Sequence, residues 1–295
     1  MRVFTARTAQ RHDPGPGHPE RPERLATVLR ALESAPQLEL VEPPPALLED
    51  LLVRHSRAYL QQVSRRGERH GNFGPDTPVG PHSWEAALAA SGAALAALRH
   101  AHDGLGHSFA AIRPPGHHAL PESGMGFCLV NHVAVLAAVA RASGRARVLI
   151  VDWDVHHGNG TQAMVEHEPD TRFVSMHQWP WYPGTGAREE RGVGNCFNIP
   201  LPPGLDRSTY VEALWAGITA ATTGWTPDVV LLSAGYDAML GDPLGGFTLE
   251  PPDYALWVNR LREALPKVPI VGLMEGGYAP ERLAAGVMAT IDALR

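Results

Sequence analysis

Short apolar runs recur along the chain, each bounded by glycine, proline or charged residues. The clearest are residues 148–151, 173–176, 229–232 and 270–273, and residues 108–112 form a weaker fifth run. The runs are apolar at almost every position and rich in β-branched residues, which is typical of parallel strands buried on both faces. The pattern therefore predicts at least five strands of a parallel sheet.

Longer stretches with a helical spacing of apolar residues separate these runs. They cover residues 84–100, 131–142, 208–222, 254–265 and 281–294. Pro251 and Pro252 fit the first turn of the fourth helix, where a missing N–H group costs little. Strands that alternate with helices predict an α/β fold with three layers, in which helices cover both faces of a mostly parallel sheet. No repeat or linker divides the chain, so we expect one domain over residues 1–295.

Composition narrows the class of protein. Apolar residues make up 44% and charged residues 19% of the 295 residues, which is ordinary for a soluble globular protein. The net charge of -6 argues against a nucleic-acid partner, because nucleic-acid-binding domains are usually basic. No stretch approaches the roughly 20 apolar residues of a membrane span, and the start of the chain lacks a signal peptide. We therefore expect a cytoplasmic protein without a membrane partner, whose two cysteines, Cys128 and Cys196, are buried and reduced.

Candidate metal ligands follow two of the predicted strands. Asp154 and His156 come directly after residues 148–151 and are two positions apart, so their side chains point the same way on an extended chain. A carboxylate and an imidazole that converge in this way suit a zinc ion. Asp152 has the same parity and would orient another residue. The loop after residues 229–232 supplies two further acids, Asp237 and Asp242, either of which could be the third ligand.

Two more strands lead into acid–base candidates. The run that ends at residue 112 is followed by Pro-Pro-Gly and the tandem pair His117 and His118, and a neutral imidazole can take a proton from water. The run 270–273 leads to Glu275-Gly-Gly-Tyr278, where the phenol can donate to a developing oxyanion. Taken singly, these motifs are often structural. Because four of them follow four predicted strands, at the edge where α/β sites form, together they predict one metal-dependent active site.

The same stretches resemble the histone deacetylase family, within the arginase–deacetylase fold. The matching segments are 113–119 (RPPGHHA), 126–128 (GFC), 151–162 (VDWDVHHGNGTQ), 182–186 (YPGTG), 233–243 (SAGYDAMLGDP) and 275–278 (EGGY), with a further likeness in 18–24 (HPERPER). They occur in the family's order over more than half of the chain, and the wording is closest to the class II branch and its bacterial relatives. The resemblance implies a sheet of about eight strands and hydrolysis of N-acylated amines.

The resemblance also implies a role for each site residue. Asp154, His156 and Asp242 would be the metal ligands, which leaves Asp237 structural. His118 would be the general base and later the acid that protonates the leaving amine. His117, held by Asp152, would be its electrostatic partner, and Tyr278 would polarise the acyl carbonyl. The implied metal is zinc, although two carboxylates and one imidazole would also accept ferrous iron.

A tunnel and a second cation belong to the same expectation. Phe127 and Tyr182 would line the tunnel for the aliphatic stem of the substrate, and the Gly126 carbonyl would face that substrate. A structural potassium or sodium ion is implied beside four residues, Asp152, Asp154, Ser175 and Met176. Asn159 stands where class I enzymes have an aspartate behind the second histidine, as in class II relatives. A neutral Asn159 stabilises protonated His118 less than a carboxylate would, so we expect a lower His118 pKa.

Competing functions differ in identifiable residues. The arginase branch uses two manganese ions and an Asp-x-His-x-Asp pattern, but here the last position is Gly158. A catalytically inactive acyl-lysine-binding protein would have lost a ligand or the tyrosine, and all are present. An esterase would use the same site.

Within the deacylases, the substrate is either an acylated lysine side chain or an acylated polyamine, and polyamine-selective relatives carry an acid at the tunnel rim. We place Leu249 at that rim position, seven residues after Asp242 and next to Glu250, which favours acyl-lysine. Asp76 is a further candidate rim acid or simply a turn residue. The acyl chain and the oligomeric state, including a homo-oligomer, are left open.

Overall fold

Eight parallel strands form one sheet in the computed structural model, which describes residues 1–295. The strands are β1 (Arg2–Thr5), β2 (Glu39–Val41), β3 (Ser108–Ala111), β4 (Val148–Asp152), β5 (Thr171–Gln178), β6 (Cys196–Leu201), β7 (Val229–Ala234) and β8 (Ile270–Met274). They lie in the order β2-β1-β3-β8-β7-β4-β5-β6, and every neighbouring pair is parallel. The predicted α/β class with an eight-stranded parallel sheet is therefore confirmed.

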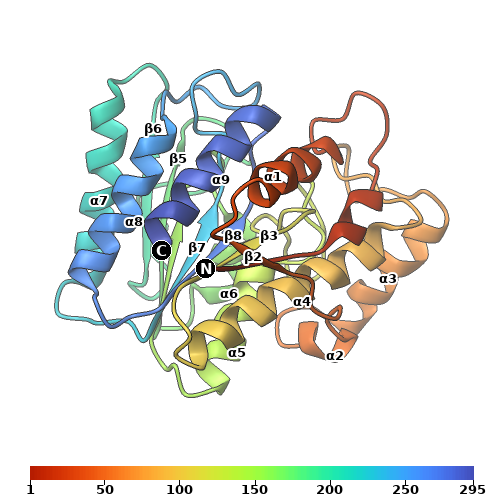
Figure 1. The fold of residues 1–295 in the computed structure, drawn as a ribbon, viewed down its shortest axis with the longest axis horizontal. Helices are drawn as coiled ribbons and strands as arrows, with labels where there is room; N and C mark the ends of the chain where they lie inside the picture. Colours follow the sequence, from red (N-terminus) through yellow and green to blue (C-terminus); the bar gives the residue numbers. More distant parts are fainter.

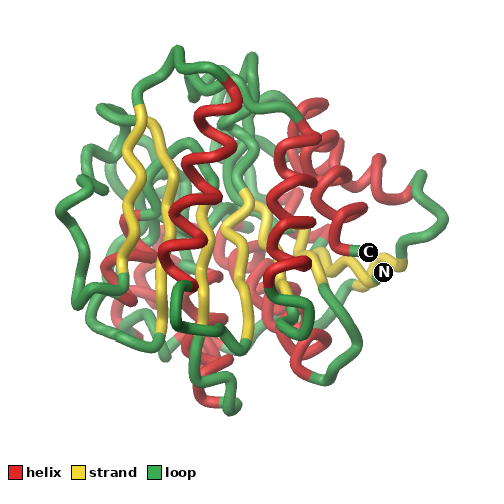
Figure 2. The backbone as a smooth tube through the Cα atoms, turned by 90° about the vertical axis from the view of Figure 1, so that its left-hand side faces the viewer, coloured by secondary structure: helices red, strands yellow, loops and turns green.

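Helices cover both faces of the sheet, so the fold has three layers (Figures 1 and 2). On one face lie α1 (Glu23–Glu33), α7 (Arg207–Thr222), α8 (Pro251–Ala264) and α9 (Pro280–Leu294). On the other lie α3 (Arg57–Glu68), α4 (Ser83–His102), α5 (His132–Ala142) and α6 (Asn159–Val165), with the short α2 (Leu48–Leu51) at the periphery. The 3-10 helix η1 (Arg7–Arg11) contributes Ala9 to the first core. None of the helices combines the length and apolarity that crossing a membrane requires.

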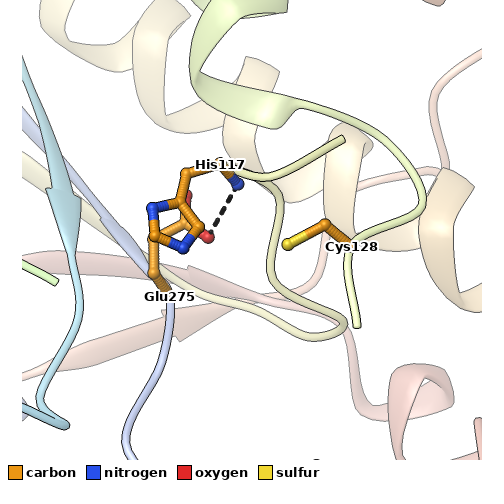
Figure 3. A group of neighbouring side chains, drawn as sticks. All are labelled: His117, Cys128 and Glu275. Carbon is orange, nitrogen blue, oxygen red and sulfur yellow. Dashed lines mark hydrogen bonds between the residues drawn. The ribbon is translucent and has the colours of Figure 1, made fainter. Parts of the chain in front are cut away.

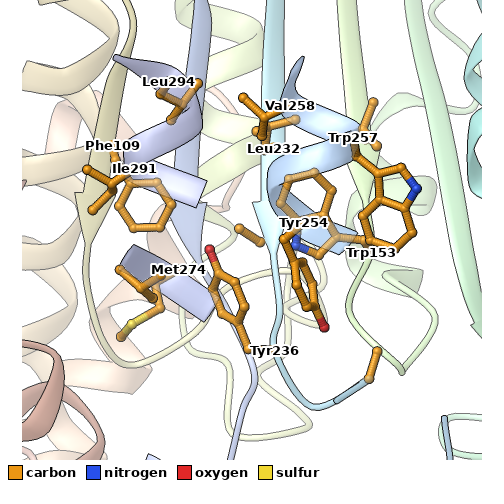
Figure 4. Close-up of a cluster of buried hydrophobic side chains, with 14 of the residues drawn as sticks. Phe109, Trp153, Leu232, Tyr236, Tyr254, Trp257, Val258, Met274, Ile291 and Leu294 are labelled. Atoms are coloured by element: carbon orange, nitrogen blue, oxygen red, sulfur yellow. The ribbon is translucent and has the colours of Figure 1, made fainter. Parts of the chain in front are cut away.

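The two hydrophobic cores reflect the alternation of side chains along each strand. In β4, Leu149 and Val151 belong to the core under α7, α8 and α9, whereas Val148 and Ile150 belong to the core under α4 and α5. Figure 4 shows part of the first core, where aromatic rings from the sheet side and from α8 pack together, with Trp153 stacked on Trp257 at 5.7 Å between ring centroids. Burial on both faces explains why these strands are apolar throughout.

All five predicted strands and all five predicted helices are present. Pro251 and Pro252 occupy the first turn of α8, as expected. Asn131 caps α5 with its side chain, which accepts a hydrogen bond from the Ala134 N–H group at 3.0 Å. Both cysteines are free and buried, as predicted.

The parallel arrangement gathers the chemistry at one edge of the sheet. Each of β3, β4, β5, β7 and β8 ends at the same edge, because neighbouring strands run in the same direction. In β4, Asp152 lies in register with Ser175 of β5 on one side and with Ser233 of β7 on the other. The loops that follow these strands therefore meet above the carboxyl ends, where ligands bind in open α/β sheets.

Candidate metal centre and active site

Asp154, His156 and Asp237 form a compact buried group at this edge. Each offers one ligand atom, and the three atoms lie within 4.8 Å of one another. The His156 Nδ1 atom is 3.1 Å from an Asp154 oxygen and 3.2 Å from an Asp237 oxygen. Asp154 and His156 extend from β4, and Asp237 extends from the neighbouring β7. Two carboxylates and one imidazole form a donor set that suits zinc or ferrous iron.

The electrostatics of this group favour a cation. Burial lowers the pKa of His156, but the facing Asp154 and Asp237 carboxylates raise it to about 10. Burial and repulsion from Asp154 raise the pKa of Asp237 to about 7. Both upward shifts reflect negative charge concentrated in a buried site. A side chain at Gly276 would collide with the carboxylates of Asp154 and Asp237, so a glycine there leaves the space beside the ligands open.

Asp242, which we expected to be the third ligand, is placed differently. One of its oxygens accepts hydrogen bonds from the Tyr278 and Ala279 N–H groups at 2.6 and 3.2 Å, and the other accepts from Leu244 N–H at 3.0 Å. It belongs to no group of clustered ligand atoms, whereas Asp237, expected to be structural, lies beside Asp154 and His156. In the structure, Asp237 therefore takes the position beside Asp154 and His156 that we expected for Asp242. Asp237 is only three residues beyond β7, so it reaches the ends of the neighbouring strands, whereas Asp242 lies five residues farther along the loop.

His117 and His118 lie side by side, and each is held by a different partner, as the sequence predicted. The His117 Nδ1 atom is 3.0 Å from an Asp152 oxygen, and the His118 Nδ1 atom is 2.7 Å from the Asn159 Oδ1 atom. The two rings are 4.0 Å apart between centroids. Both side chains are nearly inaccessible to solvent, and His118 lines the cavity described below.

The two histidines have opposite protonation tendencies. Burial lowers the pKa of His117, but Asp154 and Asp152 raise it well above the usual value for histidine. Burial lowers the pKa of His118 well below the usual value, and the charges of His117 and His156 lower it further. His118 is therefore a neutral imidazole that can accept a proton. The hydrogen bond to Asn159 raises the pKa of His118, so the expected effect of an asparagine in place of an aspartate stays a prediction. Paired groups whose pKa values are pushed apart are typical of acid–base sites.

Tyr278 faces the same cavity from the loop after β8. Its ring packs edge-on against Phe127 at 5.6 Å between centroids, and the Arg24 guanidinium lies 4.8 Å above the ring centre. Arg24 is fully buried and donates hydrogen bonds to the carbonyl groups of Gly277 and Glu275. Burial raises the pKa of Tyr278 well above the usual value, so the phenol stays protonated and can donate. The N-terminal motif that contains Arg24 thus fixes the loop that carries Tyr278.

Glu275, in the loop after β8, is hydrogen-bonded to the loop that carries His117 (Figure 3). One of its carboxylate oxygens accepts hydrogen bonds from the Gly116 and His117 N–H groups at 2.6 and 3.2 Å, and the other accepts from the Ser233 hydroxyl at 3.1 Å. His117, Glu275 and Cys128 form a second group with clustered ligand atoms. Burial raises the pKa of the Cys128 thiol well above its usual value, and the thiol donates to the Gly126 carbonyl oxygen at 3.3 Å. Because Glu275 already accepts three hydrogen bonds, we interpret this group as structural.

A cavity of about 200 Å³ leads to this site. Phe127, Tyr182 and Gly126 line it together with His118 and Tyr278, so the three expected tunnel residues are brought together. Tyr182 packs edge-on against His118 at 5.2 Å between ring centroids. Gly126 has a φ of +54°, and a side chain there would collide with the His118 ring. Only glycine allows the loop to pass this close to the histidine.

The rim of this cavity differs from the expectation. Leu249, predicted to lie there, is fully buried and pairs with Met239 beneath the surface. The rim residue on this loop is Leu244, which lines the cavity with Trp181 and Asp76. The Trp181 indole donates a hydrogen bond to the Leu244 carbonyl oxygen at 2.9 Å and thereby joins two rim loops. Leu249 and Leu244 differ by five positions, as Asp242 and Asp237 do. A single shift of five positions in the assignment of this loop therefore accounts for both differences, in the rim residue and in the third acid.

The residues expected at a monovalent cation are neighbours in the sheet. Asp152 of β4 and Ser175 of β5 are in register, and Met176 follows Ser175 in the buried part of β5. The Ser175 hydroxyl is 3.0 Å from His177 Nδ1, and the Asp152 oxygens accept from His117 and from the Asp154 N–H group. The four residues are brought together, and the identity of the cation remains a prediction.

Leu244, Trp181, Glu275 and Arg24 were given no role from the sequence. Leu244 was missed because Leu249 was assigned to the rim position of the same loop. Trp181 directly precedes the predicted tunnel residue Tyr182 but was not assigned to the tunnel. Glu275 and Arg24 were inside recognised motifs, but a buried charge that bonds to backbone groups leaves no signature in the sequence. Burial of Glu275 and Arg24 was the missing observation, since fully buried charges are rare unless they are paired.

Known proteins are similar to this chain over most of its length. Residues 18–294 match the model of the histone deacetylase domain family. The chain is 44% identical over 293 residues to the uncharacterized protein slr0245 of Synechocystis, with 96% of each chain covered. It is 36% identical to a probable deacetylase of Archaeoglobus fulgidus, covering 92% of this chain and 79% of the relative.

Two further likenesses concern an enzyme and a solved structure. The chain is 35% identical to the histone deacetylase-like amidohydrolase of Pseudomonas aeruginosa, covering 94% of this chain and 77% of that protein. A crystal structure of the HDA15 HD domain superposes with a TM-score of 0.95 at 33% identity, covering 100% of this chain and 90% of the other.

Proposed function

Because this chain belongs to the histone deacetylase family, we propose that it is a zinc-dependent deacylase that hydrolyses the amide of acetyl-lysine or of a similar short-chain acyl-lysine. Relatives named as a probable deacetylase and as a histone deacetylase-like amidohydrolase support hydrolysis of an acylated amine. The observation that carries the proposal is the placement of Asp154, His156 and Asp237 beside a cavity that His118 and Tyr278 also line.

The donor set fits a divalent metal ion. Asp154, His156 and Asp237 would hold it, and three protein ligands leave a coordination position free, as catalytic zinc requires. Such an ion would polarise the acyl carbonyl and lower the pKa of a water molecule toward ~7. Ferrous iron is accepted by the same ligands. We further propose a structural potassium or sodium ion beside Asp152, Asp154, Ser175 and Met176.

The protein's own residues divide the remaining work. His118, neutral and held by Asn159, takes a proton from the attacking water and later gives it to the leaving amine. Tyr278 donates a hydrogen bond to the oxygen that becomes negative in the tetrahedral intermediate. His117, kept protonated by Asp152 and Asp154, adds positive charge next to that centre. His118 thus acts as the proton acceptor and then the donor, and Tyr278 acts as a hydrogen-bond donor throughout.

The cavity selects a slender chain. Phe127 and Tyr182 supply apolar walls for the methylene stem of a lysine, and the Gly126 carbonyl group can accept from the amide N–H of the substrate. Burial of the stem between two aromatic rings places the amide next to His118 and Tyr278. At about 200 Å³, the space suits a lysine stem with a short acyl group.

The rim favours acyl-lysine, with acetylpolyamine hydrolysis as the second candidate. The loop position expected to discriminate between them is apolar, although it is Leu244 rather than Leu249 that lines the cavity. Asp76 is the observation that favours the second candidate, because it is the one carboxylate among the residues that line the cavity and could meet a distant ammonium group. A non-catalytic acyl-lysine-binding role is disfavoured, since the catalytic side chains are all present.

A kinetic panel tests this proposal. The purified protein is assayed with an acetyl-lysine peptide, longer acyl-lysine peptides and acetylated polyamines, and its metal content is measured on the same preparation. We expect a higher kcat/KM for acetyl-lysine than for acetylpolyamine, with one divalent ion per chain that a chelator removes together with activity. A higher kcat/KM for acetylpolyamine would favour acetylpolyamine hydrolysis as the function. Full activity without a divalent ion would overturn the proposal.

A further inference from the structure

A groove lined by three arginines lies at the end of α3. It has a volume of about 460 Å³ and is lined by Gln62, Arg65, Arg66, Glu68, Arg69 and Gly71. We call this surface the arginine groove. Its three arginines are exposed, and none of them forms an ion pair. By contrast, Arg57 at the start of the same helix pairs with Glu49 at 3.6 Å.

The charge of the groove exceeds what the helix itself requires. Basic residues commonly occupy the last turn of a helix, where the backbone carries only about half a negative charge. Three arginines against the single carboxylate of Glu68 leave two net positive charges on the lining. The whole chain has a net charge of -6, so this surface is opposite in sign to the rest of the molecule. A concentration of unpaired positive charge attracts carboxylates.

One short turn connects the groove to the mouth of the tunnel. The Arg66 guanidinium lies 4.3 Å above the Phe73 ring and donates to the Asn72 carbonyl oxygen at 2.5 Å. Asn72 pairs with Pro78, and Phe73 N–H donates to the Thr77 carbonyl oxygen at 2.9 Å, which closes the turn. Asp76, within this turn, lines the tunnel mouth.

The same turn is tied to the tunnel wall. The Thr77 hydroxyl accepts a hydrogen bond from the Phe127 N–H group at 3.0 Å. The groove, the turn and the wall therefore form one continuous structure. A peptide whose acyl-lysine fills the tunnel has residues that emerge over this rim, and each residue of an extended chain spans about 3.3–3.6 Å.

We infer that the arginine groove binds acidic side chains that flank the acylated lysine of a protein substrate. The inference rests on the proposed deacylase function and adds to it the class of substrate. Arg65 and Arg69 are the residues that meet the carboxylates, because they are one helical turn apart and carry no other partner. Arg66 holds the turn. A polyamine is repelled by the same charges.

The experiment compares matched peptides. One acetyl-lysine peptide carries glutamates three to six residues from the lysine, on both sides, and the other carries glutamines at the same positions. The acid preference is the ratio of their kcat/KM values, measured for the wild-type chain, for the Arg65→Gln/Arg69→Gln double variant and for Arg99→Gln. Arg99 is a matched control, since it is an exposed arginine without an ion pair in the last turn of α4. This turn leads into the amino end of β3, whereas the site lies at the carboxyl ends of the strands.

We expect the wild-type chain to prefer the acidic peptide by about fivefold, as two exposed ion pairs would give. The double variant should lose the preference, Arg99→Gln should keep it, and 0.5 M salt should abolish it in the wild type. Equal preference in the wild type and the double variant would overturn the inference, as would binding of a short oligonucleotide through Arg65 and Arg69 without any peptide preference.

A small acetyl-lysine substrate without flanking residues separates the two proposals. If the wild type hydrolyses it but shows no acid preference, only the docking inference falls. If the wild type does not hydrolyse it, the proposed function falls and takes the docking inference with it.

Discussion

The floor of the site and its mouth are built by different means. On the floor, Asp154, Asp237 and Glu275 are at most 1% exposed and are held by backbone N–H groups next to strand ends. At the mouth, Trp181 is 46% exposed and Tyr182 is 37% exposed, and both belong to a loop after β5. The floor is thus rigidly specified by the sheet, whereas the mouth is set by loops. We therefore expect substitutions in the floor to affect the chemical step and substitutions at the mouth to affect the choice of substrate.

The largest effect on metal binding and activity is expected from a substitution of Asp237, which lies where Asp242 was expected. Asp237→Asn should weaken metal binding by more than about 100-fold and abolish activity, because it removes a ligand charge. Asp242→Asn is the comparison variant. Its amide oxygen can still accept from the Tyr278 and Ala279 N–H groups, but its NH2 group cannot accept from Leu244 N–H, so metal content rather than activity is the deciding measurement. Metal content and kcat/KM of both variants give the answer. Loss of the metal from Asp242→Asn, with retention in Asp237→Asn, would restore the original assignment.

Tyr278→Phe should lower kcat by about 10²–10³-fold, because an oxyanion donor is typically worth about 2.7–4 kcal/mol. The metal should stay bound, since Tyr278 is not part of the ligand group. Single-turnover kinetics with metal analysis separates the two effects. Unchanged turnover would remove Tyr278 from the mechanism.

Glu275→Ala should lower kcat by about tenfold with little change in KM. The Gly116 and His117 N–H groups would lose their acceptor, and an unsatisfied buried donor costs about 1–3 kcal/mol. Glu275→Gln can accept the same two hydrogen bonds and should restore most of the activity. If the glutamine variant is as impaired as the alanine variant, the charge of Glu275 matters rather than its hydrogen bonds.

Asn159→Asp should shift the pH dependence rather than abolish activity. A carboxylate 2.7 Å from His118 Nδ1 stabilises the imidazolium and raises the pKa of His118. The base form is then lost at a higher pH, so the acidic limb of the kcat/KM profile should move upward by about one pH unit. A profile that does not move, or that moves downward, would contradict the assignment of His118 as the base.

The smallest effect is expected at the mouth. Trp181→Ala should raise KM for peptides by about threefold and leave kcat for a small substrate unchanged, because the indole contacts only the rim and its one hydrogen bond joins Leu244. Trp181→Phe keeps an aromatic face and serves as the control. A large fall in kcat would show that the mouth and the floor are not separable.

The fold was readable from the sequence because buried parallel strands are apolar on both faces. The five central strands follow this rule, whereas β1, β2 and β6 were not identified. β2 is a three-residue edge strand, and β6 contains Asn198 and Pro200, so neither has a distinctive pattern. Helix α3 was not predicted either, because seven of its twelve residues are polar or charged and its apolar residues form no clear pattern.

The candidate site was predictable where a short motif offers one residue of each type. Asp154 and His156 lie two and four residues beyond β4, His117 and His118 lie six and seven residues beyond β3, and all four are in the expected places. The loop from 235 to 250 returns to pair with itself, and its register depends on the packing of Leu249 against Met239. No local pattern encodes such packing, so the sequence alone left Asp237 and Asp242 as alternatives for the third ligand.

The central claim is that Asp154, His156 and Asp237 hold one divalent ion beside His118 and Tyr278. The most direct measurement is anomalous X-ray diffraction from crystals of the zinc-loaded protein. We predict a single strong peak enclosed by Asp154, His156 and Asp237, within reach of the tunnel. A peak at Asp242, or no peak in a protein that hydrolyses acetyl-lysine, would contradict the account.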